Sequence, residues 1–128
     1  MENKILIVDD DLWMTKVLNK TIKNIGYSDT AIVHNGIEAV STALEYAPEL
    51  IILDLVMPEL DGLTTLKLLK NITSTQSIKI IICSGNNDVE NLAKAMKLGA
   101  ADFIAKPFSA ETIKEKIELV LSSIAKNQ

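Results

Sequence analysis

The sequence predicts one α/β domain with a doubly wound sheet of five parallel strands and five helices. Five short apolar runs without in-out alternation are typical of strands that are covered on both faces of a parallel sheet. Segments with the apolar spacing of helices lie between these runs and after the last one. Because strand and helix alternate five times, right-handed crossovers place helices on both faces of one sheet.

The expected strands are nearly continuous runs of aliphatic residues. Such runs lack the polar positions that a sheet face in contact with water would carry, so we expect the strands to be buried on both faces. They are Ile5 to Val8, Ala31 to Val33, Leu50 to Leu53, Ile80 to Cys83 and Phe103 to Ala105.

The expected helices have apolar residues three or four positions apart. Gly26 and Gly99 follow the first and fourth patterns, and glycine favours the left-handed turn that ends a helix. The second helix is expected over Gly36 to Tyr46, where Pro48 stops it. The apolar positions of the other helices are Met14, Leu18, Ile22 and Ile25, then Leu63, Leu66 and Leu69, then Leu92 and Met96, and finally Ile113, Ile117, Val120 and Leu121.

The composition fits a single globular domain over residues 1–128. Hydrophobic residues make up 48% and charged residues 23% of the chain, which matches neither a disordered nor a fibrous protein. The formal net charge is −4, and no stretch gathers Lys and Arg into the basic surface that nucleic acid requires. We therefore expect no direct binding of nucleic acid by this domain.

The single cysteine and the N-terminus indicate the compartment. Cys83 can form no internal disulfide, and its place in an apolar run is typical of a small buried hydrophobic residue. No signal-peptide pattern follows Met1, and no apolar stretch approaches the roughly 20 residues that a membrane-spanning helix needs. We expect a cytoplasmic protein without a membrane partner.

Acidic residues follow two of the expected strands. Asp9, Asp10 and Asp11 come after the first strand, and Asp54 comes after the third. Ligands of doubly wound sheets bind beyond the C-terminal strand ends, so these carboxylates are expected at one edge, where they repel one another. A divalent cation, Mg²⁺ in particular, would relieve that repulsion. The alternative is that the first three only cap the first helix, which could be the whole role of Asp11.

Two further strand ends carry groups that suit a phosphoryl group. Ser84 and Gly85 supply a hydroxyl and an accessible backbone N–H after the fourth strand, and Lys106 supplies an ammonium group before Pro107. Each signal is weak alone, since serine after a strand is usually a cap and lysine before proline is usually a surface turn. Together with the acids they predict a site that distributes the charge of a phosphoryl group among several donors.

These motifs resemble the signature of the receiver domains of two-component response regulators. The resemblance covers essentially the whole chain and agrees in spacing as well as in residue type. It implies a flavodoxin-like sheet with the strand order 2-1-3-4-5. The matching segments are ILIVDDD at 5–11, LDLVMPELDG at 53–62, SG at 84–85, GAADF at 99–103 and KPF at 106–108.

The resemblance implies that Asp54 is the nucleophile that accepts a phosphoryl group from the phosphohistidine of a histidine kinase or a histidine phosphotransfer protein. It implies that Asp10, Asp54 and the backbone carbonyl of Val56 bind Mg²⁺ or Mn²⁺, and that Asp9 acts mainly through a bound water. Val56 supplies a main-chain oxygen, so its apolar side chain should not remove the metal site.

The phosphoryl oxygens would be held by further residues that the resemblance assigns. Lys106 would pair with one oxygen and the hydroxyl of Ser84 would donate to another, while the N–H groups of Val56 and Gly85 would hold the rest. The peptide bond between Lys106 and Pro107 is cis in the family, which would aim the ammonium group inward.

The output implied by the resemblance is a change of shape. Phosphate would draw Ser84 inward, the ring of Phe103 would fill the space, and the face of the fourth helix, fifth strand and fifth helix would be remodelled for an output protein or domain. Phe103 lacks the hydroxyl that many relatives carry and would act by packing, and the alternative is an ordinary core aromatic. The chain would catalyse only its own phosphorylation and slow dephosphorylation, and so is not expected to be an enzyme.

The rate of dephosphorylation is expected to depend on the side chains at positions 56 and 86, which in the family flank the attacking water. Val56 offers that water no hydrogen bond, which should slow hydrolysis. Asn86 acts in the opposite direction, because its amide could recruit water from the other side.

Two residues near the expected site are given structural roles. His34 lies in a turn after the second strand and is not expected to be a phosphohistidine. Trp13 lies one turn into the first helix and is expected to be a partly exposed packing residue that can serve as a fluorescence reporter.

Three rival functions fit less well. A phosphatase of the haloacid dehalogenase type needs an acid two positions after the nucleophile, where this chain has Val56. A flavodoxin-like cofactor binder needs a phosphate-binding loop after the first strand, where three carboxylates would repel a phosphate. A degenerate receiver that only binds partners is disfavoured because every phosphorylation residue is present.

The sequence leaves the biological setting open. A stand-alone regulator, an intermediate of a phosphorelay and a part of a longer regulator are all compatible with it. The cognate kinase, the output partner and a homodimer that forms on phosphorylation are equally undetermined.

Overall fold

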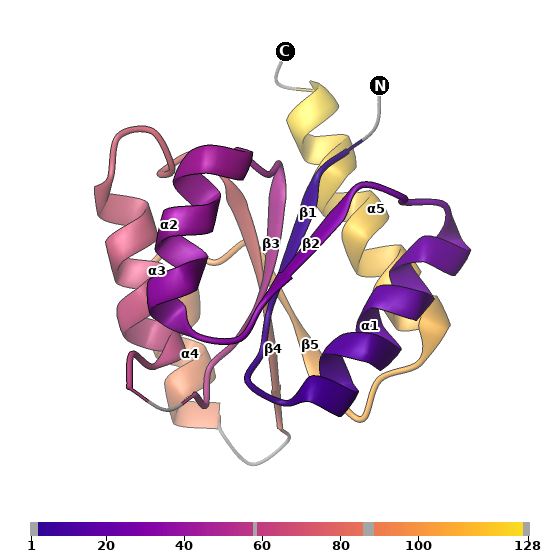
Figure 1. Ribbon diagram of the computed structural model, residues 1–128, viewed down its shortest axis with the longest axis horizontal. Coiled ribbons are helices and arrows are strands. Elements are labelled where there is room, and N and C mark those ends of the chain that lie inside the picture. Colours follow the sequence, from indigo (N-terminus) through magenta and orange to yellow (C-terminus); the bar gives the residue numbers. More distant parts are fainter. Residues whose placement is uncertain (1–2, 58, 86–88, 127–128) are drawn as a thin grey trace.

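The computed structural model describes residues 3–57, 59–85 and 89–126. Its strands form one parallel sheet in the order β2-β1-β3-β4-β5, as predicted, with helices on both faces (Figure 1). The strands are β1 (Ile5–Val8), β2 (Thr30–Val33), β3 (Leu50–Asp54), β4 (Lys79–Gly85) and β5 (Asp102–Lys106). The helices are α1 (Leu12–Ile25), α2 (Gly36–Tyr46), α3 (Gly62–Asn71), α4 (Val89–Lys97) and α5 (Ala110–Lys126).

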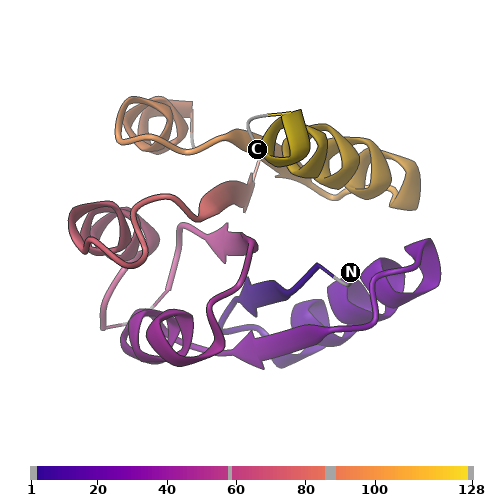
Figure 2. The same ribbon diagram turned by 90° about the horizontal axis from the view of Figure 1, so that it is seen from above.

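The helices form the two outer layers of the domain. Helices α1 and α5 cover one face of the sheet, and α2, α3 and α4 cover the other (Figures 1 and 2). The chain winds from β1 to β2 in one direction and then returns to place β3 on the other side of β1. The winding therefore reverses between β1 and β3, which is where doubly wound sheets bind their ligands. Within the described ranges, none of the helices has the length and apolar character to cross a membrane.

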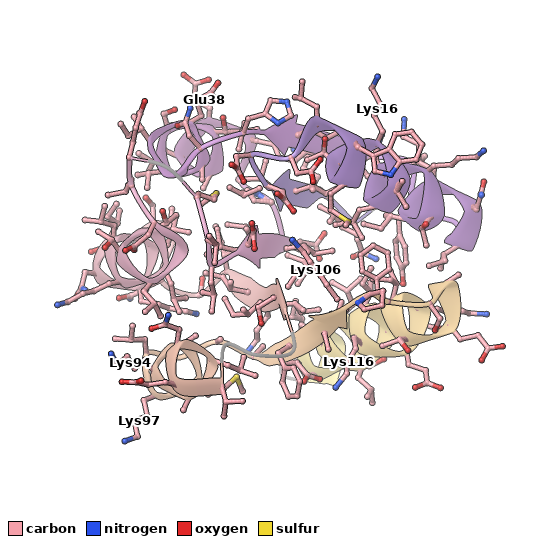
Figure 3. The ribbon with its side chains drawn as sticks, turned by 90° about the horizontal axis from the view of Figure 1, so that it is seen from below. Lys16, Glu38, Lys94, Lys97, Lys106 and Lys116 are labelled. Carbon is pink, nitrogen blue, oxygen red and sulfur yellow. The ribbon has the colours of Figure 1, made fainter. Side chains whose placement is uncertain are left out.

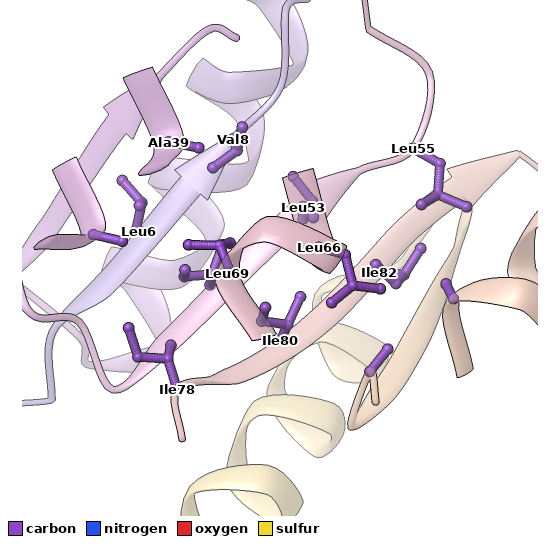
Figure 4. Close-up of a cluster of buried hydrophobic side chains, with 14 of the residues drawn as sticks. Leu6, Val8, Ala39, Leu53, Leu55, Leu66, Leu69, Ile78, Ile80 and Ile82 are labelled. Atoms are coloured by element: carbon purple, nitrogen blue, oxygen red, sulfur yellow. The ribbon is translucent and has the colours of Figure 1, made fainter. Parts of the chain in front are cut away.

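The sheet separates two hydrophobic cores, because successive side chains of a strand point to opposite faces. In β1, Leu6 and Val8 face the core under α2, α3 and α4 (Figure 4), whereas Ile5 and Ile7 face the core under α1 and α5. All four side chains are at most 1% exposed. This burial on both faces explains why the strand reads as a continuous apolar run.

The two edge strands depart from the predicted burial. In β2 only Val33 is buried, and in β5 only Ile104 is buried, while Phe103 is 38% exposed. The prediction that the strands are covered on both faces is therefore wrong for β5, where Phe103 and Ala105 are exposed. Strand β2 is partly covered on both faces, because Ala31 packs against one core and Ile32 against the other. An edge strand has a neighbour on one side only, and the flanking helices cover its outer positions incompletely.

Polar side chains cap the N-termini of α1, α2 and α3. Asp11 is the N-cap of α1, as expected, and accepts hydrogen bonds from the N–H groups of Trp13 and Met14. Asn35 and Asp61 cap α2 and α3 in the same way. These caps satisfy backbone donors that the first helical turn leaves free.

Gly62 lets α3 approach the end of β3. A Cβ atom at this position would lie 2.3 Å from the carbonyl oxygen of Asp54 and 2.5 Å from the Cα atom of Leu55. The N–H of Gly62 donates to the carbonyl oxygen of Leu55 at 2.9 Å. The start of α3 is thus packed directly against the backbone that carries Asp54.

Candidate functional site

Three carboxylates meet at the C-terminal edge of the sheet. Asp9 and Asp10 follow β1, and Asp54 is the last residue of β3, the neighbouring strand. One carboxylate oxygen from each residue lies within 4.8 Å of those of the other two. Asp9 and Asp54 are 3% and 6% exposed, whereas Asp10 is open to solvent. The cluster is therefore a buried pair of acids with a third acid at its mouth.

Among the described residues, Lys106 is the cation that forms ion pairs with this cluster. It is the last residue of β5, and its ammonium group lies in the middle of the sheet edge (Figure 3). Its Nζ atom lies 3.1 Å from Oδ2 of Asp9 and 3.4 Å from Oδ1 of Asp54. The peptide bond that follows Lys106 is cis, as the resemblance implied. One ammonium group thus bridges two of the three carboxylates and leaves an excess of negative charge.

The carboxylate of Asp54 is held in an environment that disfavours its charge. Burial, followed by repulsion from Asp9, raises the pKa of Asp54 to about 6. The charge of Lys106 and a hydrogen bond from the backbone of Val56 oppose this rise. For Lys106 itself, burial lowers the pKa, but the negative charges of Asp54 and Asp9 outweigh burial, and the pKa is raised. The ammonium group therefore stays charged.

Ser84 and Gly85 lie at the same edge, at the end of β4 between β3 and β5. Ser84 is 3% exposed, whereas Gly85 is exposed and pairs in register with Lys106. The expected hydroxyl donor and the expected lysine therefore come from adjacent strands. The preceding Cys83 is buried, and burial raises the pKa of its thiol to about 12, so it is a neutral packing group as predicted.

Val56 lies in the loop that follows Asp54, with its side chain 69% exposed. Its backbone N–H reaches the carboxylate of Asp54. The side chain thus stands in solvent beside the acidic cluster. Asn86, the other residue expected to influence dephosphorylation, lies outside the described residues.

Phe103 points outward from the domain and is not a core aromatic. Its ring centroid lies 5.1 Å from Nζ of Lys116 on α5, and that ammonium group also pairs with Asp102 at 2.9 Å. A cation above the face of an aromatic ring is weakly attractive at such an exposed position. Phe103 is therefore held on the surface between β5 and α5.

The contacts that Lys106 and His34 make with Asp9 were not predicted from the sequence. The ammonium group of Lys106 was expected to pair with a phosphoryl oxygen. In the structure it donates a hydrogen bond to the carboxylate of Asp9. His34, which was given no role at the site, lies next to it, with Nδ1 3.0 Å from the backbone carbonyl oxygen of Asp9. The strand order implied by the resemblance was enough to place His34 near the site. Strand β2 lies beside β1, and His34 directly follows the last residue of β2. Trp13 is 72% exposed and so packs less than expected.

We predict that replacing Asp54 by Asn stabilises the metal-free protein at neutral pH. A carboxyl group whose pKa is higher in the folded than in the unfolded state favours folding only while it is protonated. The stability of the wild type should therefore fall between the unfolded and folded pKa values, and Asp54→Asn should escape this loss. In EDTA, the variant should unfold with a free energy larger by about 2 kcal/mol near pH 7.5, and by almost nothing near pH 3, below the pKa of the unfolded chain.

Urea denaturation at several pH values measures this difference. Asp61→Asn is the matched control, because it removes one charge from an exposed helix cap and retains the capping oxygen. The control should change the free energy of unfolding by less than about 0.5 kcal/mol. A stability gain for Asp54→Asn that did not vary with pH would contradict the proposed cause.

Comparisons with known proteins assign this chain to a family. A family model described as the response regulator receiver domain matches residues 5–118. Chemotaxis protein CheY of Bacillus subtilis (strain 168) is 37% identical over 122 residues, which cover 95% of this chain and 100% of that protein.

Solved structures agree with the family model. The REC domain of AraT, a response regulator from Geobacillus stearothermophilus, superposes with a TM-score of 0.89 at 25% identity, covering 100% of this chain and 99% of that one. NtrX from Brucella abortus superposes with a TM-score of 0.88 at 28% identity, covering 96% of this chain and 27% of that one. The strand order, the acidic cluster with its lysine and the match over residues 5–118 together show that the chain belongs to the response regulator receiver domain family.

Proposed function

We propose that this receiver domain is a phosphorylation-activated switch of a two-component system, with Asp54 as the phosphate acceptor. The observation that carries the proposal is the position of Asp54. Its carboxylate lies at the topological switch point of the sheet, 3.4 Å from the ammonium group of Lys106 and beside two further acids. A charged nucleophile with a cation beside it suits the transfer of a phosphoryl group.

The charge of the cluster fits a divalent cation. Three carboxylates face one ammonium group, and buried like charges at this separation destabilise one another unless cations balance them. Oxygen ligands of this kind suit Mg²⁺ or Mn²⁺. Asp10, Asp54 and the carbonyl oxygen of Val56 would hold the ion directly, and Asp9 would act through water. The ion would neutralise charge on the transferred phosphoryl group.

In the proposed reaction, a carboxylate oxygen of Asp54 attacks the phosphorus atom of a phosphohistidine. The new bond joins that oxygen to phosphorus, the bond between phosphorus and the imidazole nitrogen breaks, and the imidazole leaves with the bonding electrons. Lys106 stabilises a phosphoryl oxygen, the hydroxyl of Ser84 donates to another, and the N–H groups of Val56 and Gly85 bind the rest. The chain thereby catalyses only its own phosphorylation and the slow hydrolysis of the aspartyl phosphate, which releases inorganic phosphate.

The partners of this reaction are a histidine kinase or a histidine phosphotransfer protein on one side and an output protein or domain on the other. This chain matches 27% of the NtrX chain, so the matching part of that protein belongs to a longer polypeptide. We propose that phosphate draws Ser84 inward and that Phe103 leaves the surface for the space so opened. The outward ring of Phe103 and the edge position of β5 support this movement, which would remodel the face of α4, β5 and α5.

We predict that Mg²⁺ and acetyl phosphate add one phosphoryl group to Asp54. Intact-protein mass spectrometry should detect the added mass in the wild type and not in Asp54→Asn. Hydroxylamine should remove the group, because it cleaves acyl phosphates. Equal modification of Asp54→Asn, or an adduct that resists hydroxylamine, would refute Asp54 as the acceptor.

We predict different effects of Asp10→Ala and Lys106→Ala on metal binding. Removing a carboxylate that binds the ion should weaken Mg²⁺ binding by at least about tenfold, since even an outer partner of a metal ligand is worth that much. Lys106→Ala should bind Mg²⁺ at least as tightly as the wild type, because its ammonium group competes for the same carboxylates, yet it should be phosphorylated poorly.

Titration of the fluorescence of the exposed Trp13 with Mg²⁺ measures this affinity in each variant. Unfolding curves of the variants show that each is folded under the same conditions. Equal Mg²⁺ affinity of wild type and Asp10→Ala would exclude Asp10 as a ligand.

We predict that Val56→Asn shortens the lifetime of the phosphorylated protein. The exposed apolar side chain cannot orient an attacking water, whereas an amide there can. One hydrogen bond is worth about 1.4 kcal/mol at most in such a step, so hydrolysis should accelerate by up to about tenfold. Mg²⁺ affinity should not change, because the ion would use the carbonyl oxygen of residue 56. Phosphate release after removal of the donor decides the matter, and an unchanged or longer half-life would rule out this role of Val56.

A further inference from the structure

His34 contacts the acidic cluster through a hydrogen bond that the proposed chemistry does not use. Its Nδ1 atom lies 3.0 Å from the backbone carbonyl oxygen of Asp9. A carbonyl oxygen can only accept, so Nδ1 must carry a proton and donate it. The contact therefore selects the Nδ1–H tautomer of the neutral imidazole.

The position of this bond in the sheet shows what it replaces. Val8 pairs with Val33, and the N–H of Asp9 continues the ladder by donating to the carbonyl oxygen of Val33 at 3.3 Å. In a regular parallel ladder, the next donor, to the carbonyl of Asp9, is the N–H of residue 35. The chain turns into α2 there, with Asn35 as the N-cap. The side chain of His34 thus provides a ladder bond at the point where the strand ends.

The backbone that this bond fixes carries two of the acids. The carbonyl of Asp9 belongs to the planar peptide unit that includes the nitrogen of Asp10. Holding its oxygen sets the orientation of that plane and hence the direction in which Asp10 leaves the strand. Asp10 is exposed, so packing restrains its side chain little, and the backbone must place it.

The side chain of Asp9 is anchored from other directions. Its Oδ1 atom accepts from the N–H of Asp11 at 3.0 Å, and its Oδ2 atom accepts from Lys106 at 3.1 Å. The bond to Lys106 is one that a bound cation would weaken by competing for the carboxylate. The bond from His34 is made to the backbone, so it does not compete with a cation for the carboxylate oxygens.

We infer that His34 is a positioning residue for a divalent cation, because its Nδ1–H fixes the Asp9–Asp10 peptide in the orientation that turns the carboxylates toward Asp54. The inference rests on the proposed metal-dependent phosphorylation. It adds His34, from the connection between β2 and α2, to the residues that serve the metal site. His34 itself is not a ligand. It keeps the site preorganised, so that binding the cation does not require ordering of the peptide.

Two substitutions of similar size separate the hydrogen bond from the shape of the side chain. His34→Asn retains a donor at the position of Nδ1, and His34→Leu lacks one. The dissociation constant for Mg²⁺, measured by calorimetry and by Trp13 fluorescence, should rise about three- to tenfold in His34→Leu, as expected for one lost hydrogen bond. In His34→Asn it should stay within about twofold of the wild type.

A second measurement tests the bond in the unmodified protein. The nitrogen NMR shifts of a neutral imidazole distinguish its tautomers, and at about pH 8 His34 should be in the Nδ1–H form with and without Mg²⁺. An Nε2–H tautomer would overturn the inference. So would equal Mg²⁺ affinity of His34→Leu and the wild type, or equal weakening in the Asn and Leu variants. Wild-type protein that bound no Mg²⁺ at all would instead refute the proposed function, and the role of His34 with it.

Discussion

Repulsion among three carboxylates is the constraint on which the rest of this structure depends. Asp9 and Asp54 are buried and within reach of each other and of Asp10, an arrangement that costs free energy unless cations balance it. The internal cation is Lys106, which bridges Asp9 and Asp54. It leaves an excess of negative charge, and the proposed divalent cation would balance this excess and stabilise the folded domain by binding to it.

The compensating lysine also joins the site to the edge of the sheet. Lys106 lies two strands away from Asp54 in the order β3-β4-β5, so the balance of charge is reached only when the whole sheet is formed. Phe103 lies on the same strand, three residues earlier, and faces outward against Lys116. Lys106 and Phe103 are therefore the two ends of one connection along β5, and the proposed movement of Phe103 involves the strand that also holds the lysine of the site.

The fold was accessible from the sequence because its determinants are local. Continuous apolar runs such as residues 50–53 identified central strands, Gly26 marked the end of α1, and Gly36 to Tyr46 was predicted with the bounds that α2 has. The burial of the edge strands was not accessible. Residues 103–105 are as apolar as a central strand, and only the position of β5 at the end of the sheet leaves Phe103 exposed. Neighbours in space decide exposure, and a run of residues does not specify them.

The sequence by itself determined the chemistry that this protein can offer: carboxylates after two strands, a hydroxyl after the fourth and an ammonium group after the fifth, at spacings that resemble receiver domains. Tertiary structure alone decided which of these groups touch. The bridge from Lys106 to Asp9 joins residues 97 positions apart, and the bond from His34 to Asp9 joins residues 25 apart. Such contacts depend on strand order and on the register between strands, which set distances of a few ångströms that residue type and spacing do not contain.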